Sequence, residues 1–110
     1  MEKITFNFDK KTVIITGGAQ GFGFDIARRF LDSGAKVIIW DIDSKMLEKA
    51  TKDLDNPNLS SNIVDVSNYK EVEGCVNEII KNLNIDILIN NAGITGTTSS
   101  LWEYDVDRWK

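Results

Sequence analysis

Glycines clustered in one short segment could bind a phosphate group. Residues 16–23 read T-G-G-A-Q-G-F-G; they follow the apolar run at residues 13–15 and lead into an amphipathic stretch. This order predicts a strand, a glycine turn and a helix. A phosphate accepts hydrogen bonds from backbone N–H groups at a helix N-terminus, and Gly17, Gly21 and Gly23 have no Cβ to hold it off. We therefore expect a nucleotide pyrophosphate to bind here.

The spacing of these glycines narrows the type of loop. A G-x-G-x-x-G fingerprint fails, because a start at Gly17 meets Ala19 and a start at Gly21 meets Ile26. A P-loop fails as well, since no Lys follows Gly23. The pattern T-G-x-x-x-G-x-G remains. Taken alone, this pattern is equally consistent with a tight connection between strand and helix that binds no ligand.

A carboxylate stands where a dinucleotide-binding fold places its ribose-binding acid. Asp41 ends the apolar run at residues 35–40 and lies about twenty residues beyond the glycine loop. It could accept hydrogen bonds from both adenosine-ribose hydroxyls and would repel a 2′-phosphate. The following residue, Ile42, is uncharged, so the sequence favours NAD over NADP. The alternative role, capping the next helix, suits Asp43 and Ser44 better.

Composition excludes several other classes of function. The 110 residues carry a net charge of −4, contain no histidine, and contain a single cysteine. These features disfavour a nucleic-acid partner, a metal site and an internal disulfide. Cys75 lies within an apolar helical stripe and is expected to be a small core residue. We find no apolar run of signal-peptide or membrane-spanning length, which predicts a cytoplasmic protein without a membrane partner.

Strand-like and helix-like segments alternate along the chain. Strands are expected at residues 12–16, 35–40, 63–64 and 85–89, after a short lead-in at residues 4–8. Between them, amphipathic stripes predict helices, the first ending at Gly34, the second at residues 55–58, and the third capped by Ser67 or Asn68.

This alternation predicts an α/β fold with a Rossmann-like, doubly wound parallel sheet in strand order 3-2-1-4. Residues 1–110 would form a single NAD-binding domain, truncated after the fourth strand and the start of another helix at residues 101–110. The glycine loop and residues 90–93 would meet at the switch point, where ligands bind such sheets.

Four motifs in this order resemble the short-chain dehydrogenase/reductase family: the glycine segment, Asp41, Asp65-Val66, and N-N-A-G at residues 90–93. The resemblance covers the whole chain but only the N-terminal half of a typical member. Within the family it is most similar to 3-oxoacyl-carrier-protein reductases and NAD-linked sugar or alcohol dehydrogenases. Phe22 departs from the family pattern, which usually has Ile or Leu there.

The resemblance implies NAD as cofactor and a role for each matching residue. The glycine segment would hold the pyrophosphate, Asp41 the adenosine ribose, Asp65 and Val66 the adenine, and Asn90 the second ribose, while Asn91 would pin the fourth strand. The expected cofactor-binding residues are Thr16, Gly17, Gln20, Gly21, Phe22, Gly23, Asp41, Ile42, Asp65, Val66, Asn90, Ala92 and Gly93.

The catalytic Ser, Tyr, Lys and Asn of the family would lie beyond Lys110, so none is expected in this chain. The resemblance therefore implies the cofactor half of an NAD-dependent oxidoreductase that transfers hydride to or from a small carbonyl or alcohol substrate. Tyr104 and Arg108 are expected on a helix surface. The 110-residue chain itself should be inactive, and the full-length protein should form a dimer or tetramer. The alternative is a non-catalytic nucleotide-binding or interaction module.

Overall fold

The computed structural model describes residues 8–19 and 21–91. Strands and helices alternate through these residues, as the sequence predicts. In chain order, the elements are β1 (Thr12–Thr16), α1 (Gly21–Asp32), β2 (Lys36–Asp41), α2 (Ser44–Leu54), β3 (Leu59–Ile63), α3 (Tyr69–Ile80) and β4 (Ile87–Asn90).

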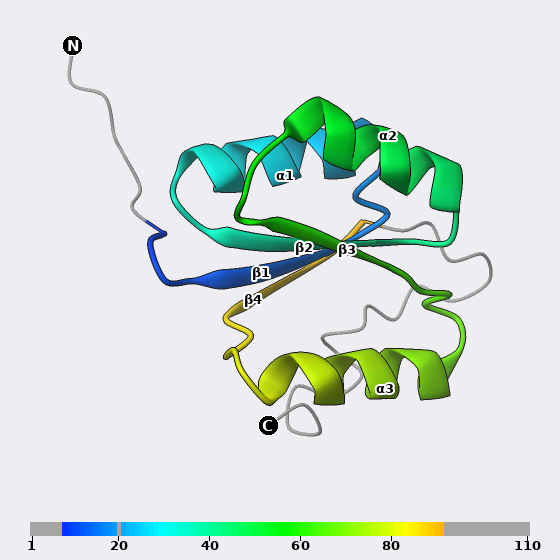
Figure 1. Cartoon of the computed structure of the whole chain (residues 1–110). Helices are drawn as coiled ribbons and strands as arrows, with labels where there is room; N and C mark the ends of the chain where they lie inside the picture. Colours follow the sequence, from blue (N-terminus) through cyan, green and yellow to red (C-terminus); the bar gives the residue numbers. More distant parts are fainter. Residues whose placement is uncertain (1–7, 20, 92–110) are drawn as a thin grey trace, which may run out of the picture.

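The four strands form one parallel sheet in the order β3-β2-β1-β4, which confirms the predicted 3-2-1-4 arrangement. Helices α1 and α2 cover one face of the sheet and α3 covers the other (Figure 1). All carboxyl ends of the strands therefore lie along the same edge. The loop after β1 leaves the sheet between β2 and β4, at the switch point.

The core is divided by the sheet into two apolar clusters. Alternate residues of β1 and β2 point to opposite faces, because successive side chains of a strand do so. Val13, Ile15, Val37 and Ile39 pack under α1 and α2. On the other face, Ile14, Ile38 and Trp40 pack with Val64 and with α3 residues Val72 and Val76. Burial on both faces accounts for the near-continuous apolar runs of these strands.

The third strand lies earlier in the chain than predicted. The expectation of a strand at residues 63–64 is wrong, because β3 spans Leu59–Ile63 and Val64 lies beyond its end. Leu59 lies opposite Val37 and Ile63 opposite Asp41, so pairing with β2 sets the position of this strand. As an outer strand with mostly exposed side chains, β3 needs no apolar run of its own.

The start of β4 and the ends of the helices follow local hydrogen bonds. Asp86 precedes β4 and exchanges two bonds with the start of β1: its N–H donates to the Thr12 carbonyl at 3.0 Å, and its carboxylate accepts from the Thr12 N–H at 2.9 Å. Strand β4 therefore begins at Ile87 and not at residue 85. Asp43 and Asn68 cap α2 and α3, as the sequence suggested.

Candidate functional site

The glycine loop is held at the end of β1 by the neighbouring strand β2. The N–H groups of Gly17 and Gly18 donate to the Trp40 carbonyl at 2.7 and 3.3 Å. The Ala19 N–H donates to a carboxylate oxygen of Asp41 at 3.4 Å. Three consecutive loop N–H groups therefore have partners on β2 and are not free to bind a ligand.

The first turn of α1 differs from those of α2 and α3 in the partners that the described residues offer to its N–H groups. The first four N–H groups of a helix have no partner within that helix. In α2 and α3 the side chains of Asp43 and Asn68 accept hydrogen bonds from this turn. Among the described residues, no side chain does so for Gly21, Phe22 or Gly23. With respect to the described residues, which leave out Gln20, these N–H groups and the positive end of the helix dipole are therefore available to an anion.

Two glycines of this turn are required for different reasons. Gly21 has a φ of +59°, and a Cβ built there meets no atom within 4 Å, so the space beside it is open. A Cβ on Gly23 would overlap the carbonyl of Gly17 and would lie 2.8 Å from the side-chain nitrogen of Asn91. Gly23 thus serves close packing between helix, loop and β4, and Gly21 leaves room for a ligand.

A buried hydroxyl joins β1 to β4 below the loop. The Thr16 side chain donates to Oδ1 of Asn90 at 3.0 Å and accepts from the backbone N–H of Asn91 at 3.0 Å. The Asn91 amide in turn donates to the Gly17 carbonyl at 3.2 Å. This arrangement supports the expected role of Asn91 in pinning the fourth strand. It also gives Thr16 a positioning role, because its hydroxyl is fully buried.

Asp41 lies at the end of β2 with only 9% of its surface exposed. One carboxylate oxygen accepts from the Ala19 N–H and the other from the Asp43 N–H at 3.1 Å. A carboxylate has about four acceptor positions, so both oxygens keep capacity for ribose hydroxyls. Next to it, Ile42 is 65% exposed, and Phe22 on α1 is 79% exposed. These two apolar side chains are exposed to solvent at the carboxyl edge of the sheet.

Asp65 and Val66 follow β3 at the same edge. Oδ1 of Asp65 accepts from the hydroxyl and the N–H of Ser67, at 2.6 and 2.9 Å. These bonds hold the pKa of Asp65 below its ordinary value, and the bond from the Ser67 hydroxyl has the larger effect. Desolvation has a smaller effect in the opposite direction. The carboxylate is therefore ionised at neutral pH. Val66 is half-buried and packs against the α3-side cluster.

The structure brings most of the predicted site residues to one edge of the sheet. Thr16 bonds to Asn90, Gly17 and Gly23 lie against the Asn91 side chain, and Asp41 contacts the loop directly. Gln20, Ala92 and Gly93 lie outside the described residues. Sequence reasoning missed Trp40, whose carbonyl holds the loop. The strand register pairs Trp40 with Thr16, and only knowledge of that register could have revealed it.

The described part of the chain contains no cluster of three or more potential metal ligands. Within it, no helix is long and apolar enough to cross a membrane. Cys75 is half-buried on α3, and burial, with a smaller effect of the Glu71 charge, raises the pKa of its thiol. Cys75 was expected to be a core residue. It instead lies at the border of the apolar cluster between the sheet and α3, among the residues that are only partly buried.

Comparison with protein families places nearly the whole chain in one of them. The family model described as short chain dehydrogenase matches residues 11–110. Meso-2,3-butanediol dehydrogenase of Serratia marcescens is 36% identical over 104 residues, which make up 94% of this chain and 41% of that protein. A 3-oxoacyl-acyl-carrier-protein reductase of Chlamydia trachomatis is 40% identical over 89 residues, or 77% of this chain and 36% of that protein.

Solved structures show the same arrangement of elements. A citronellol catabolism dehydrogenase of Pseudomonas aeruginosa superposes with a TM-score of 0.76 at 29% identity, covering 88% of this chain and 42% of that one. RhlG of the same organism, solved with NADP, superposes with a TM-score of 0.72 at 26% identity, covering 81% and 37%. The chain thus spans about two fifths of the length of these relatives.

Proposed function

The chain belongs to the short-chain dehydrogenase family, and from that premise we propose that it binds NAD(H) at the carboxyl edge of its sheet. In this proposal it is the cofactor-binding part of an oxidoreductase that acts on a small carbonyl or alcohol substrate. The observation that carries the proposal is the pair formed by the first turn of α1, which no described side chain caps, and the Asp41 carboxylate beside the same loop. One feature suits a pyrophosphate and the other suits a ribose.

Each half of the cofactor has donors or acceptors of the required kind. The N–H groups of Gly21 and Phe22 would bind the pyrophosphate, and the open space beside Gly21 would let it approach. Asp41 would accept from the adenosine ribose, with the exposed Ile42 against the adenine. Asp65 and Val66 would complete the adenine pocket, and Asn90 would approach the second ribose. The bound nicotinamide would supply the hydride chemistry.

We assign NAD, and not NADP, because of Asp41. Family members use either dinucleotide, and RhlG was solved with NADP. In this chain, a 2′-phosphate would lie beside a carboxylate that is 9% exposed and so weakly screened by water. A ribose hydroxyl there gains a hydrogen bond to a charged group, worth about 1.5–3 kcal/mol. The expected preference for NAD is therefore at least about ten-fold.

In this proposal, reaction with a substrate depends on residues beyond these 110. The proposal places the general acid/base and its partners in sequence that follows Lys110 in a longer protein, and it takes the 110-residue chain to be inactive alone. A substrate similar to a 3-oxoacyl group, assembly into a dimer or tetramer, and a cytoplasmic location belong to the same proposal. The second candidate, a non-catalytic nucleotide-binding module, shares the same cofactor site and differs only in lacking turnover.

Calorimetric titration of NAD and NADP into the 110-residue chain tests the cofactor assignment. The structure shows that Asp41→Ala would also leave the N–H groups of Ala19 and Asp43 without their acceptor. Asp41→Asn, which keeps one oxygen acceptor, is therefore measured beside it. NAD should bind the parent chain more tightly than NADP. Asp41→Asn should reduce the ratio between the two affinities. Equal or tighter binding of NADP by the parent chain refutes the assignment.

A longer chain decides between the two candidate functions. Extension of the coding sequence beyond Lys110 through a Y-x-x-x-K segment should yield a protein that oxidises NADH in the presence of carbonyl substrates. An extended chain that binds NAD but turns over no ketone, sugar or alcohol would support the binding module.

A further inference from the structure

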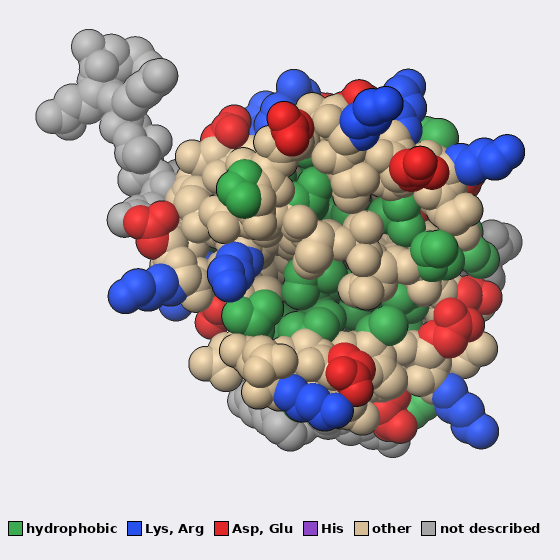
Figure 2. Space-filling view, viewed as in Figure 1, with side chains coloured by type: hydrophobic (Ala, Val, Ile, Leu, Met, Phe, Trp, Pro, Cys, Tyr) green, Lys and Arg blue, Asp and Glu red, His purple; other side chains and the backbone are tan. Residues whose placement is uncertain are grey.

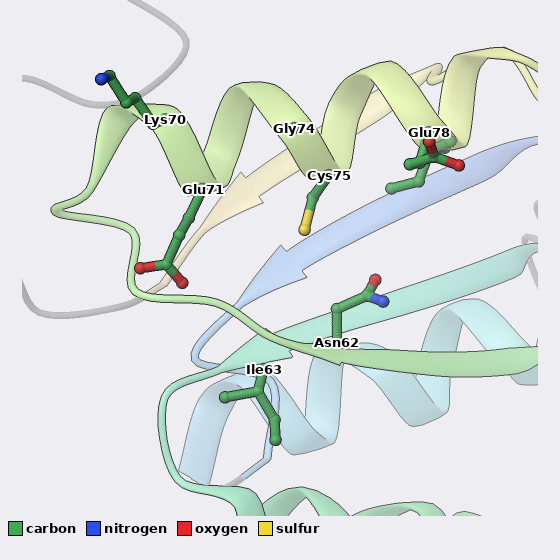
Figure 3. A pocket seen from close by; sticks show the side chains of 8 residues that line it. Asn62, Ile63, Lys70, Glu71, Gly74, Cys75 and Glu78 are labelled. Carbon is green, nitrogen blue, oxygen red and sulfur yellow. The ribbon is translucent and has the colours of Figure 1, made fainter.

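The outer edge of β3 and the adjacent side of α3 enclose a groove away from the glycine loop. Its volume is about 410 Å³, and its lining includes Asn62 from β3 and Gly74, Cys75 and Ile79 from α3. Pockets that hold ligands are commonly about 300–1,000 Å³. Figure 2 shows hydrophobic side chains exposed in the hollow between β3 and α3. In Figure 3 the Cys75 side chain points from α3 toward the sheet, and Asn62 points from β3 toward α3.

The backbone of β3 along this groove has hydrogen-bonding groups that pair with no strand among residues 8–19 and 21–91. The Val37 N–H donates to the Asn58 carbonyl, and the Val64 N–H donates to the Asp41 carbonyl. The even-numbered residues between 58 and 64 therefore direct their backbone groups toward β2, and the odd-numbered ones direct theirs outward. Since β3 is the outermost strand of the described sheet, the N–H and C=O groups of Ser61 and Ile63 face outward with no strand beside them.

This edge lacks the features that usually prevent pairing with another chain. Natural edge strands are often protected by lysine, proline or a bulge. Strand β3 has the sequence L-S-S-N-I, without charge or proline, and Ile63 at its end is 61% exposed. The edge is therefore chemically open to an added strand.

The charges beside the groove select the kind of strand that would fit. Glu71 points from α3 toward the space at the end of β3, whereas Lys70 points away from the sheet (Figure 3). Glu71 accepts a hydrogen bond from the Asp65 N–H and has no cationic partner among the described residues. Glu78 is partly neutralised by Lys81 at 2.9 Å. The groove is thus apolar at its base and anionic at its wall.

We propose that this groove binds an extended peptide segment that pairs with Ser61 and Ile63 as an added strand and presents apolar side chains, flanked by Lys or Arg, on its face toward α3. Every second side chain of such a strand would face α3. Its backbone would satisfy the outward groups of β3, in the manner of β-strand addition. Its apolar side chains would cover Cys75 and Ile79, and its cations would approach Glu71. A second copy of β3 fits less well, because its α3-side residues, Ser60 and Asn62, are polar and bring no cation.

Fluorescence anisotropy with two labelled peptides tests the chemistry of the partner. The probes are K-T-V-T-V-T-K and its matched counterpart E-T-V-T-V-T-E, each titrated with the 110-residue chain. In an extended strand, the charged and valine side chains of each probe lie on the same face. The lysine peptide should bind, and the glutamate peptide should bind at least about ten-fold more weakly because it places anions beside Glu71. Equal binding of both peptides, or binding of neither, overturns the proposal.

Two pairs of variants test the location. Ser61→Pro removes an outward N–H without loss of a bond to β2, and Ser61→Ala keeps that N–H as the control. Gly74→Phe would fill the groove, since a Cβ at Gly74 meets nothing within 4 Å, and Gly74→Ala is its control. The proline and phenylalanine variants should each weaken binding of the lysine peptide by about ten-fold, and the alanine variants by much less.

Circular dichroism establishes that each variant is folded, and the Gly74 pair tests the groove even if the proline variant does not fold. Unchanged binding by folded Ser61→Pro and Gly74→Phe shows that the peptide binds elsewhere and refutes the proposal. Sedimentation of the chain alone provides a further test. Self-association that Ser61→Pro abolishes would identify a second copy as the occupant and would also refute it.

Discussion

Replacing Thr16 by valine should destabilise the protein although the two side chains have nearly the same shape. The Thr16 hydroxyl is fully buried, donates to Asn90 Oδ1 at 3.0 Å and accepts from the Asn91 N–H at 3.0 Å. Valine makes neither bond and leaves both groups without this partner. Because those two asparagines are half-buried, water compensates part of the loss.

The expected magnitude follows from these two bonds. A buried polar group that loses its partner costs about 1–3 kcal/mol, and the lower part of that range applies to half-buried groups. Thr16→Val should therefore lower the free energy of unfolding by about 2–3 kcal/mol, out of a total of about 5–15 kcal/mol for a domain. Thr16→Ser is the matched control, since it keeps the hydroxyl and loses one buried methyl group, worth about 1 kcal/mol.

Urea unfolding followed by far-UV circular dichroism measures both variants. The midpoint for Thr16→Val should be lower than that for Thr16→Ser, with similar slopes for all three proteins. Valine has the higher strand propensity of the two, so propensity alone would give the opposite order. If Thr16→Val is as stable as the parent protein, the hydroxyl does not join β1 to β4 in the way described.

Further predictions concern the loop, one carboxylate and activity. Gly21→Val should abolish NAD binding, because the valine side chain would occupy the open space at the start of α1. The positive φ of Gly21 adds about 1 kcal/mol of strain to the variant. Calorimetry measures NAD binding, and circular dichroism shows whether the variant is still folded. Because the pKa of Asp65 is lowered in the folded protein, the carboxylate stabilises the fold at pH values above its ordinary pKa of 3.8. This contribution is lost as the pH falls through the pKa of the folded state. Ser67→Ala removes the hydroxyl bond and should raise the pKa of Asp65 in an NMR titration. The 110-residue chain should not oxidise NADH with ketones, sugars or alcohols, and a rate similar to that of an extended protein would show that the catalytic group lies within these residues.

Local patterns in the sequence were sufficient to predict the elements that carry the site. β-Branched runs indicated β1 and β2, and the amphipathic stripes indicated the helices after them. The caps Asp43 and Asn68 were each one of two adjacent candidates, because a cap bonds to N–H groups only two or three residues away. The strand order followed from the right-handed crossovers that parallel strands require.

The edge strand could not be located in this way. Leu59 is the first residue of β3, and the segment after it is mostly polar. Its strand conformation comes from pairing with β2, and such pairing leaves no apolar pattern when one side of the strand faces solvent. The same position at the edge leaves the outward backbone groups of Ser61 and Ile63 without a partner strand in the described part of the chain.

The sequence by itself determined the alternation of strands and helices, the glycine loop at the start of α1, and the acid at the end of β2. Tertiary structure alone decided which backbone N–H groups of that loop already have hydrogen-bond partners. The Trp40 carbonyl takes two loop N–H groups, and Thr16 bonds to Asn90 across 74 residues of chain. Spacing within a sequence reveals contacts between residues a few positions apart. Contacts between strands depend on their register, which is set only when the sheet forms.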